Sequence, residues 1–360
     1  MTRFTRIALM ALVISMLGAQ LASAQFADGS APTAPKPVDD KDSTWSRPGP
    51  WRLTGIAGLT LTQSASSDNW YGGDRGSWMW VARFDGTAER QFNPRFHSSN
   101  TLQLAYGQTS QQQIDPNNPQ ARVWDTPSKS TDRIGFESVG RFTLDRWADP
   151  YFAASVVSQF LDQSQPNGTL SFNPVQVKLS AGLSKTLVKQ ADRELITRLG
   201  VGARSVFGRN FVEPLPSQQT ASYNNSDAGL EWVTTTTWPL LDKRVLYKGR
   251  LGLFQPFMYS QSSELKAFDQ AAMAADPTRR AVADYWKAVD INFENTFSAA
   301  ITKNLSVELF AQLVYNKFDS AGNVDPNAPL AVTTALVDRN IRLAGQFRET
   351  LALALSMRLF

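Results

Sequence analysis

The sequence lacks cysteine altogether. A disulfide framework, a thiolate metal site and lipidation of an N-terminal cysteine are therefore excluded. The net charge of +4 is small for 360 residues and does not indicate a nucleic-acid-binding protein. After the first 24 residues, no continuous apolar run reaches the roughly 20 residues that a transmembrane helix needs. A phosphate-binding loop, a dinucleotide fingerprint, a His-Glu metal motif and a Gly-x-Ser-x-Gly motif are missing as well, so we predict no cofactor and no metal site.

The first 50 residues predict export. A basic start precedes an apolar run from Ile7 to Leu21 and then Ala22-Ser23-Ala24, which is typical of a secretory signal peptide over residues 1–24. An N-terminal membrane anchor is the alternative, but the apolar run is short for a span. Residues 25–50 are rich in Pro, Ala, Asp and Ser without periodicity, which predicts a flexible periplasmic segment.

Residues 51–360 alternate between apolar and polar side chains in about twelve stretches. In the stretch from Trp78 to Glu89, for example, the aromatic and aliphatic residues take every second position, and the charged residues lie between them. This period of two predicts strands with one face toward lipid, and the mean hydropathy of −0.28 fits because only alternate residues face outward. A soluble β-sandwich would also alternate, but in shorter strands.

The connections between these stretches are alternately short and long. Short ones include 91–95, 189–193 and 302–304, whereas long polar ones include 107–131, 208–227 and 319–340. Bacterial outer-membrane barrels have this asymmetry, with short periplasmic turns and longer outer loops. We therefore predict an all-β fold: a single transmembrane antiparallel up-and-down β-barrel of about 12 strands. One long connection carries a predicted short helix around Glu264 to Ala275, ended by Asp276-Pro277.

The last twenty residues, 341–360, form a long alternating stretch that ends on Phe360. A terminal strand closing on an aromatic residue resembles the C-terminal assembly signal of bacterial outer-membrane barrels, although here Leu359 is in phase with the outward face and Phe360 comes one position later. This resemblance implies an interaction with the barrel-assembly machinery.

A second resemblance rests on Asn69-Trp70 and Gly72-Gly73, which follow the first stretch, together with His97-Ser98 and Tyr106-Gly107. The chain resembles an uncharacterised family of Gram-negative outer-membrane barrels that has an Asn-Trp-x-x-Gly-Gly signature after its first strand. The resemblance covers Trp51 to Phe360. It implies a fold and a location, but no activity.

The alternation assigns a set of charged side chains to the interior of the barrel. They are Arg83, Asp85, Glu89, Arg133, Glu137, Arg141, Lys178, Arg198, Arg204, Glu231, Lys248, Arg250, Asp290, Glu294, Glu308 and Arg348. Two interpretations stay open: an aqueous channel whose charges tune selectivity, or a lumen filled by mutual ion pairs. A basic stripe for anions, formed by Arg198, Arg204, Lys248 and Arg250, is one version of the first.

His97 is the only histidine and begins the sequence His97-Ser98-Ser99-Asn100, which resembles the His-x-Ser-Asn stretch of outer-membrane phospholipase A. The resemblance implies His97 as base and Ser99 as nucleophile. Against it, Thr101 stands where the phospholipase has Gly, and the phase places both side chains toward the lumen at the periplasmic rim.

Together these patterns predict an exported protein of the bacterial outer membrane, in contact with its lipid and lipopolysaccharide. The leading hypothesis is a narrow channel or transport barrel for small polar solutes. The alternatives are a plugged structural or surface-interaction barrel that acts through its long outer loops, and a lipid-acting enzyme that uses His97 and Ser99.

Overall fold

The computed structural model describes residues 48–64, 76–115, 118–144, 146–164, 168–190, 192–211, 219–302, 304–319 and 329–358. The signal peptide, most of segment 25–50, the Asn69-Trp70 signature and Phe360 lie outside the described residues. Within the described ranges, the strands are β1 (Arg52–Ser64), β2 (Ser77–Asn93), β3 (Phe96–Asp115), β4 (Asn118–Trp124), β5 (Ser128–Phe142), β6 (Asp149–Ser158), β7 (Leu161–Asp162), β8 (Leu170–Ser171), β9 (Val175–Lys189), β10 (Glu194–Phe211), β11 (Thr220–Leu240), β12 (Val245–Tyr259), β13 (Asp290–Ala300), β14 (Leu305–Tyr315) and β15 (Gln346–Arg358).

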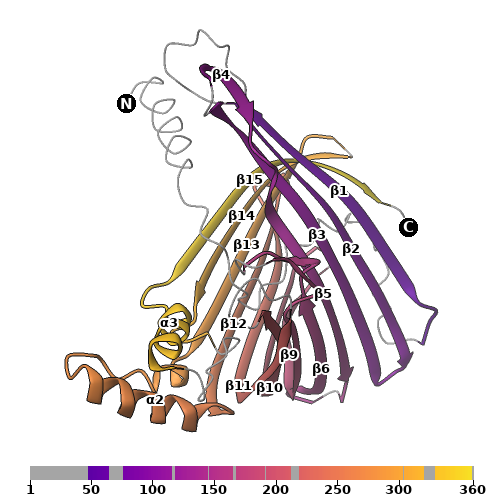
Figure 1. Ribbon diagram of the computed structural model, residues 1–360. Coiled ribbons are helices and arrows are strands. Elements are labelled where there is room, and N and C mark those ends of the chain that lie inside the picture. Colours follow the sequence, from indigo (N-terminus) through magenta and orange to yellow (C-terminus); the bar gives the residue numbers. More distant parts are fainter. Residues whose placement is uncertain are drawn as a thin grey trace, which may run out of the picture.

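Twelve of these strands form a closed antiparallel barrel, as predicted. The ring runs β1, β2, β3, β5, β6, β9, β10, β11, β12, β13, β14 and β15, and β15 pairs with β1 (Figure 1). Each strand of the ring therefore pairs with a neighbour on both sides, which is what allows a β-structure to cross hydrocarbon. We call the junction of β1 and β15 the seam.

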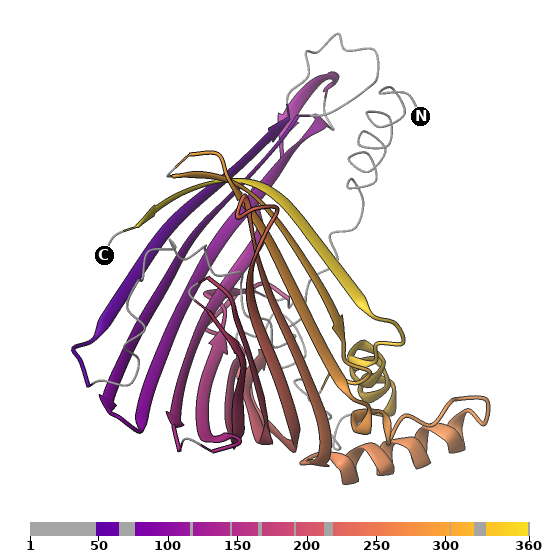
Figure 2. The ribbon, with the colours of Figure 1, turned by 180° about the vertical axis from the view of Figure 1, so that it is seen from behind.

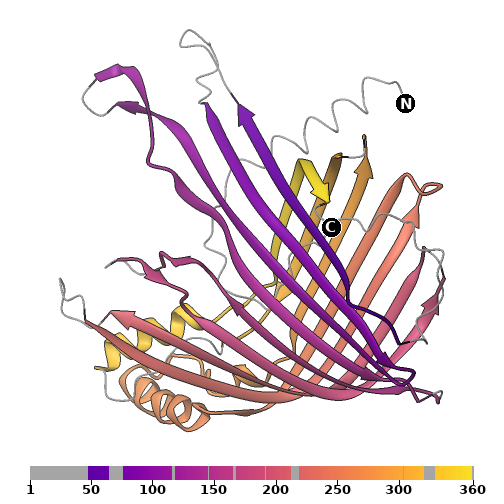
Figure 3. The same ribbon diagram turned by 90° about the vertical axis from the view of Figure 1, so that its right-hand side faces the viewer.

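The two ends of the barrel differ. Tight turns follow β2, β5, β9, β11 and β13, whereas the longer connections follow β1, β3, β6, β10, β12 and β14. We call these the short-turn end and the long-loop end. Figure 3 shows the strands running obliquely between them, as the closure of a barrel requires.

The long connections carry more structure than the sequence predicted. The predicted loop 107–131 instead extends β3 into a hairpin with β4, and the last loop contains α3 (Leu330–Asn340). Strands β10 and β11 reach into the predicted loop 208–227, with Phe211 opposite Thr220. The helix predicted near Glu264 is confirmed as α2 (Ser262–Ala275), followed by the short η2 (Tyr285–Lys287).

A small hydrophobic core lies at the long-loop end. It consists of Tyr259, Leu265, Phe268, Ala272, Val282, Trp286, Phe318 and Val337, which we call the cap cluster. Side chains of α2, η2 and α3 meet in it at the end of β12. Figure 2 shows α2 and α3 close together at this end of the barrel. The Asp269 carboxylate fixes the following loop by accepting the backbone N–H groups of Val282 and Ala283, at 2.8 and 2.7 Å. The cap cluster is thus a packed unit rather than a flexible tether.

The two faces of the barrel wall follow the predicted alternation. Leu59, Leu179, Leu199, Leu230 and Leu353 are exposed on the outside. Buried polar residues lie on the inside, among them Asp85, Gln103, Glu231, Glu294 and Glu308. The sequence of β6 is apolar on both faces and so does not assign them. In the structure this strand buries Tyr151, Ala153 and Val157 and exposes Phe152 and Val156. A polar interior and an apolar exterior invert the pattern of a soluble protein.

Candidate functional site: an ion-paired lumen

The charged residues assigned to the interior lie on nine strands around the barrel. Arg83 and Asp85 are on β2, Arg133, Glu137 and Arg141 on β5, Lys178 on β9, Arg198 and Arg204 on β10, Glu231 on β11, Lys248 and Arg250 on β12, Asp290 on β13, Glu308 on β14 and Arg348 on β15. Several of them form ion pairs with a residue of another strand, so the lumen is crossed by side chains at several levels.

Glu137 is the centre of one group. Its Oε1 accepts from Arg198 Nη2 at 3.1 Å, and its Oε2 accepts from Arg250 Nη1 at 3.4 Å. Strands β5 and β12 have four strands between them in the shorter direction round the ring. The contact of Glu137 with Arg250 therefore spans the lumen and divides it. The side chain of Glu137 is 27% exposed, so this layer is accessible to water.

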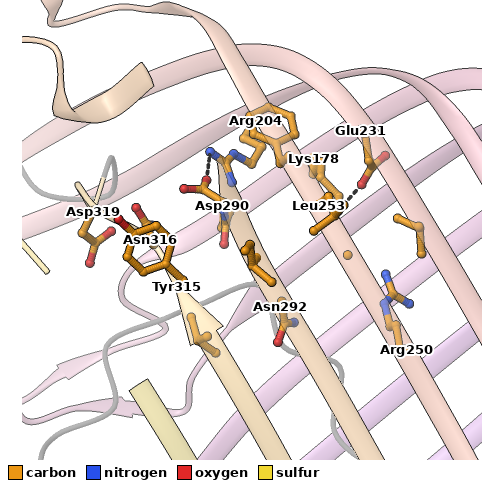
Figure 4. Close-up of a pocket in the computed structure, with 16 residues that line it drawn as sticks. Lys178, Arg204, Glu231, Arg250, Leu253, Asp290, Asn292, Tyr315, Asn316 and Asp319 are labelled. Carbon is orange, nitrogen blue, oxygen red and sulfur yellow. Dashed lines mark hydrogen bonds and ion pairs between the residues drawn. The ribbon is translucent and has the colours of Figure 1, made fainter. Parts of the chain in front are cut away.

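Arg204 is the centre of a second group (Figure 4). Its guanidinium donates to both Asp227 oxygens, at 2.8 and 2.6 Å, and to Asp290 at 2.7 Å. The same guanidinium lies over the ring of Phe254, 3.8 Å from the centroid. The guanidinium thus makes two hydrogen bonds to one carboxylate and one to another. These bonds satisfy much of its donor capacity, which allows the charged side chain to be buried.

Asp227 was missed by the sequence analysis because it was assigned to a loop. It has the same alternation phase as Glu231, so extending the strand pattern by two pairs of residues would have found it. Glu231 itself accepts from Lys178 Nζ at 2.8 Å, as Figure 4 also shows.

Arg83 makes a third cross-strand pair. Its guanidinium bonds Glu308 in a bidentate manner, at 2.7 and 2.9 Å. The two residues lie on β2 and β14, which flank β1 and β15, so this pair bridges the seam from inside the barrel. Gly58 of β1 leaves room for it, because an added Cβ there would come within 2.8 Å of Arg83 Nε.

The predicted basic stripe is largely neutralised. Arg198 and Arg250 share Glu137, and Arg204 is held by two aspartates. Lys248 lines a cavity of about 240 Å³ together with Arg133, Glu137, Arg250, Glu294 and several threonines. This volume would hold several water molecules or one small solute, since a water molecule occupies about 30 Å³. It lies between the wall β3–β5–β6 and the wall β11–β12–β13.

His97 and Ser99 lie on β3 near the short-turn end, and the Ser99 hydroxyl donates to Glu89 at 3.3 Å. Among the described residues, no group of three or more His, Asp or Glu side chains is arranged to hold a metal ion. None of the helices in those residues is long and apolar enough to cross a membrane.

Aromatic side chains gather on the outside at the short-turn end. Trp51, Phe92, Phe96, Phe142 and Phe152 form a chain of ring contacts, with centroids 4.8–6.4 Å apart. Cations accompany this band: Arg90 lies over the Phe92 ring, Lys185 over Trp147 and Arg193 over Trp238. Aromatic rings with nearby cations on a barrel exterior are typical of a lipid–water interface.

Comparison with known proteins gives a family likeness without an activity. The family of proteins of unknown function DUF3078 matches residues 61–163, which run from the end of β1 to just past β7. This stretch contains the Asn69-Trp70 signature and His97. No curated protein matches the chain.

Several solved barrels are similar to the chain in overall form. The translocator domain of the autotransporter NalP from Neisseria meningitidis is 8% identical, with 85% of this chain and 87% of that chain covered and a TM-score of 0.33. An outer membrane channel from Pseudomonas putida F1 is 11% identical, with 89% and 100% covered and a TM-score of 0.35. BamA from Haemophilus ducreyi, lacking POTRA domains 1–3, is 11% identical, with 86% and 71% covered and a TM-score of 0.25. These scores are low, and the barrel is established by its own strand pairing.

Proposed function

We propose that this chain is a bacterial outer-membrane barrel that acts as a narrow channel for small polar solutes. Membrane placement is supported by the exposed leucines around the barrel and by the aromatic band with its cations. In this placement the short-turn end faces the periplasm and the long-loop end faces outward, in contact with lipopolysaccharide. Insertion would depend on the barrel-assembly machinery and on the terminal segment that ends at Phe360.

The observation that carries the channel proposal is the water-accessible layer at Glu137. One carboxylate holds guanidinium groups from two other strands, and a cavity of about 240 Å³ adjoins it. A constriction made of side-chain charges, rather than of a packed apolar plug, can open by small side-chain movements and selects solutes by charge.

A closed barrel that acts through its outer loops is the second candidate. The cap cluster supports it, because a packed core at the long-loop end presents a shaped surface at the mouth. The bidentate Arg83–Glu308 pair and the Arg204 group also fill part of the interior.

Single-channel recording in planar bilayers separates the two candidates. The channel proposal expects stable conductance, and a larger and more anion-selective conductance for Glu137→Gln, because two guanidinium groups then face the path without their carboxylate. Asp192→Asn is the matched control, since Asp192 pairs with Lys243 in the turns at the short-turn end. Barrels that insert correctly but stay silent in both wild type and Glu137→Gln would contradict the channel and favour the closed barrel.

Phospholipase-like activity through His97 and Ser99 stays a prediction. The hydrogen bond from Ser99 to Glu89 occupies the hydroxyl with a carboxylate of the same interior face. Hydrolysis of phospholipid in mixed micelles that is lost in both His97→Ala and Ser99→Ala would support the enzyme, and hydrolysis at background level in the wild type would contradict it.

A further inference from the structure

A guanidinium group lies on the outer surface of the barrel at the short-turn end. Arg90 of β2 has the same alternation phase as Phe92, which is exposed on the exterior. The Arg90 guanidinium carbon is 4.8 Å from the centroid of the Phe92 ring and 5.9 Å from that of the Trp51 ring. The two rings contact each other edge to face, with centroids 5.7 Å apart. They therefore hold a cation on the surface that the proposed membrane placement turns toward lipid.

Arg90 has no acidic partner within the described part of the chain. No residue described there accepts a hydrogen bond from its guanidinium or forms an ion pair with it, and its Nε is buried. Other cations of the barrel do have such partners: Lys243 pairs with Asp192 at 2.8 Å, and Arg83 bonds to Glu308. Near hydrocarbon, where charges are poorly solvated, a guanidinium is strongly stabilised by an anion within hydrogen-bonding distance.

Ser98 of β3 supplies a second donor beside Arg90. The two residues are directly opposite each other in the β2–β3 ladder and have the same outward phase, so their side chains are neighbours. The Ser98 Oγ accepts a hydrogen bond from Asn100 Nδ2 at 3.3 Å. Asn100 Nδ2 also donates to the Ala88 carbonyl at 3.2 Å, which fixes the orientation of this amide. The hydroxyl proton of Ser98 is therefore directed to another acceptor.

The hydrogen bonds around Ser98 all run in one direction. Ser138 of β5 donates to Asn100 Oδ1 at 2.8 Å, and Asn100 donates in turn to Ser98. In the described residues, nothing accepts the proton at the end of this series. The series thus brings a hydroxyl donor next to the Arg90 guanidinium. Two adjacent donors, one of them cationic, fit a single anion that has several oxygen atoms.

The surroundings of these two donors are suited to a lipid. Arg90 and Ser98 are half-buried, so a ligand can reach them from the exterior. Toward the short-turn end they adjoin the band of aromatic rings, which is typical of the level of lipid head groups. Toward the long-loop end the outer surface of the same strands continues with Ala88, Leu102 and Phe136. An anionic group at the level of the rings, with apolar chains along the wall, matches this arrangement.

We infer that Arg90 and Ser98 bind the phosphate of a glycerophospholipid on the outer surface of the barrel. The guanidinium and the hydroxyl donate to the phosphate oxygens, and the acyl chains lie along Ala88, Leu102 and Phe136. Both donors recognise phosphate oxygens, so the phosphate determines binding rather than the alcohol esterified to it. This inference rests on the proposed membrane placement but not on channel activity.

Photolabelling of the full barrel in a phosphate-free non-ionic detergent tests this site. The probe is phosphatidylglycerol with a diazirine close to its glycerol backbone, used below saturation, and the labelled residues are mapped by mass spectrometry. We expect labelling of β2 and β3 near Arg90 and Ser98, and much weaker labelling by a diacylglycerol probe with the same chains, which lacks the phosphate.

Variants assign the labelling to the two donors. Arg90→Gln should lower it about tenfold, the value of one charge-assisted hydrogen bond, and Ser98→Ala about fivefold. Arg193→Gln is the matched control, because Arg193 lies over the Trp238 ring in the same aromatic band, and it should leave labelling of β2 and β3 unchanged. Heat-modifiable gel mobility verifies that each variant is folded. If Arg90→Gln does not fold, Ser98→Ala, which removes a single hydroxyl, provides the deciding comparison.

The inference would be overturned by equal labelling of β2 and β3 with the two probes. Labelling that is unchanged in folded Arg90→Gln, or in Ser98→Ala where that variant decides, would overturn it as well. Conductance of the same samples is recorded separately. A silent barrel that is labelled through Arg90 would contradict the channel alone, whereas a conducting barrel without this labelling would contradict the lipid site alone.

Discussion

Glu137 of β5 and Arg250 of β12 contact each other across the interior of the barrel, with Oε2 and Nη1 3.4 Å apart. Arg198 of β10 bonds the other oxygen of the same carboxylate at 3.1 Å. Three walls of the barrel are therefore linked through one side chain, and this side chain should matter for stability as well as for permeation.

Replacing Glu137 by Gln should destabilise the barrel. The change leaves Arg198 and Arg250 close together without their shared carboxylate, and breaking a buried ion pair from one side costs about 3–5 kcal/mol. Because Glu137 is 27% exposed, we expect a loss of up to about 3 kcal/mol in the free energy of unfolding. Urea unfolding in lipid vesicles, followed by tryptophan fluorescence, measures it. Asp192→Asn should change nothing measurable, and an equal effect of the two variants would contradict the prediction.

Gly58→Val should weaken the Arg83–Glu308 ion pair that bridges the seam. The added side chain would meet Arg83, whose Nε lies 2.8 Å from an ideal Cβ, and would push the guanidinium away from Glu308. We expect faster amide exchange where β1 and β15 pair, over Ile56–Thr60 and Ala354–Arg358. Gly252→Val is a suitable control, since a Cβ there meets only a backbone oxygen at 3.8 Å.

A double mutant refines this test. If Gly58→Val acts through Arg83, then adding Arg83→Gln should cause little further loss. Additive effects of the two substitutions would show that valine disturbs the seam by another route.

Leu265→Ala should unfold the cap cluster and spare the barrel. Leu265 is fully buried in this cluster, and truncating a buried leucine costs about 2–5 kcal/mol. We expect rapid hydrogen exchange in α2 and α3, with the heat-modifiable gel mobility of the barrel unchanged. Met273→Ala, an exposed position on the same helix, should leave exchange as in the wild type. Loss of the folded barrel in Leu265→Ala would show that the two units are coupled.

The β3–β4 hairpin should loosen in acid. Hydrogen bonding of the Gln111 N–H to the Asp125 carboxylate, at 2.6 Å, lowers the pKa of Asp125. Because the pKa is lower in the folded state, the stabilisation is present above the carboxyl's ordinary pKa and is lost as the pH falls through the folded-state value. The anisotropy of a fluorophore on Val123→Cys should fall in that range. In an Asp125→Ala background it should be low and independent of pH, and a flat curve with Asp125 present would contradict the prediction.

The fold of this protein could be predicted from the sequence because a membrane barrel repeats one local rule. Each strand alternates between lipid and lumen, so Leu199 and Arg198 are assigned to opposite faces without knowledge of any partner. Turn lengths, the α2 helix and the interior position of Glu137 or Glu231 follow from the same local signals. The faces of β6 were not predictable, because Tyr151, Ala153 and Val157 alternate with residues that are just as apolar.

The tertiary structure alone decided which residues meet. Arg250 contacts Glu137 although at least four strands lie between theirs in the ring. Arg83 and Glu308 are 225 positions apart in the sequence. No local pattern could therefore pair these residues. The same holds for the short β1–β15 register and the cap cluster, which assemble segments that are distant in the chain. Alternation fixes the face of each side chain through local backbone geometry, whereas the partner across the lumen depends on strand tilt, register and closure of the whole ring.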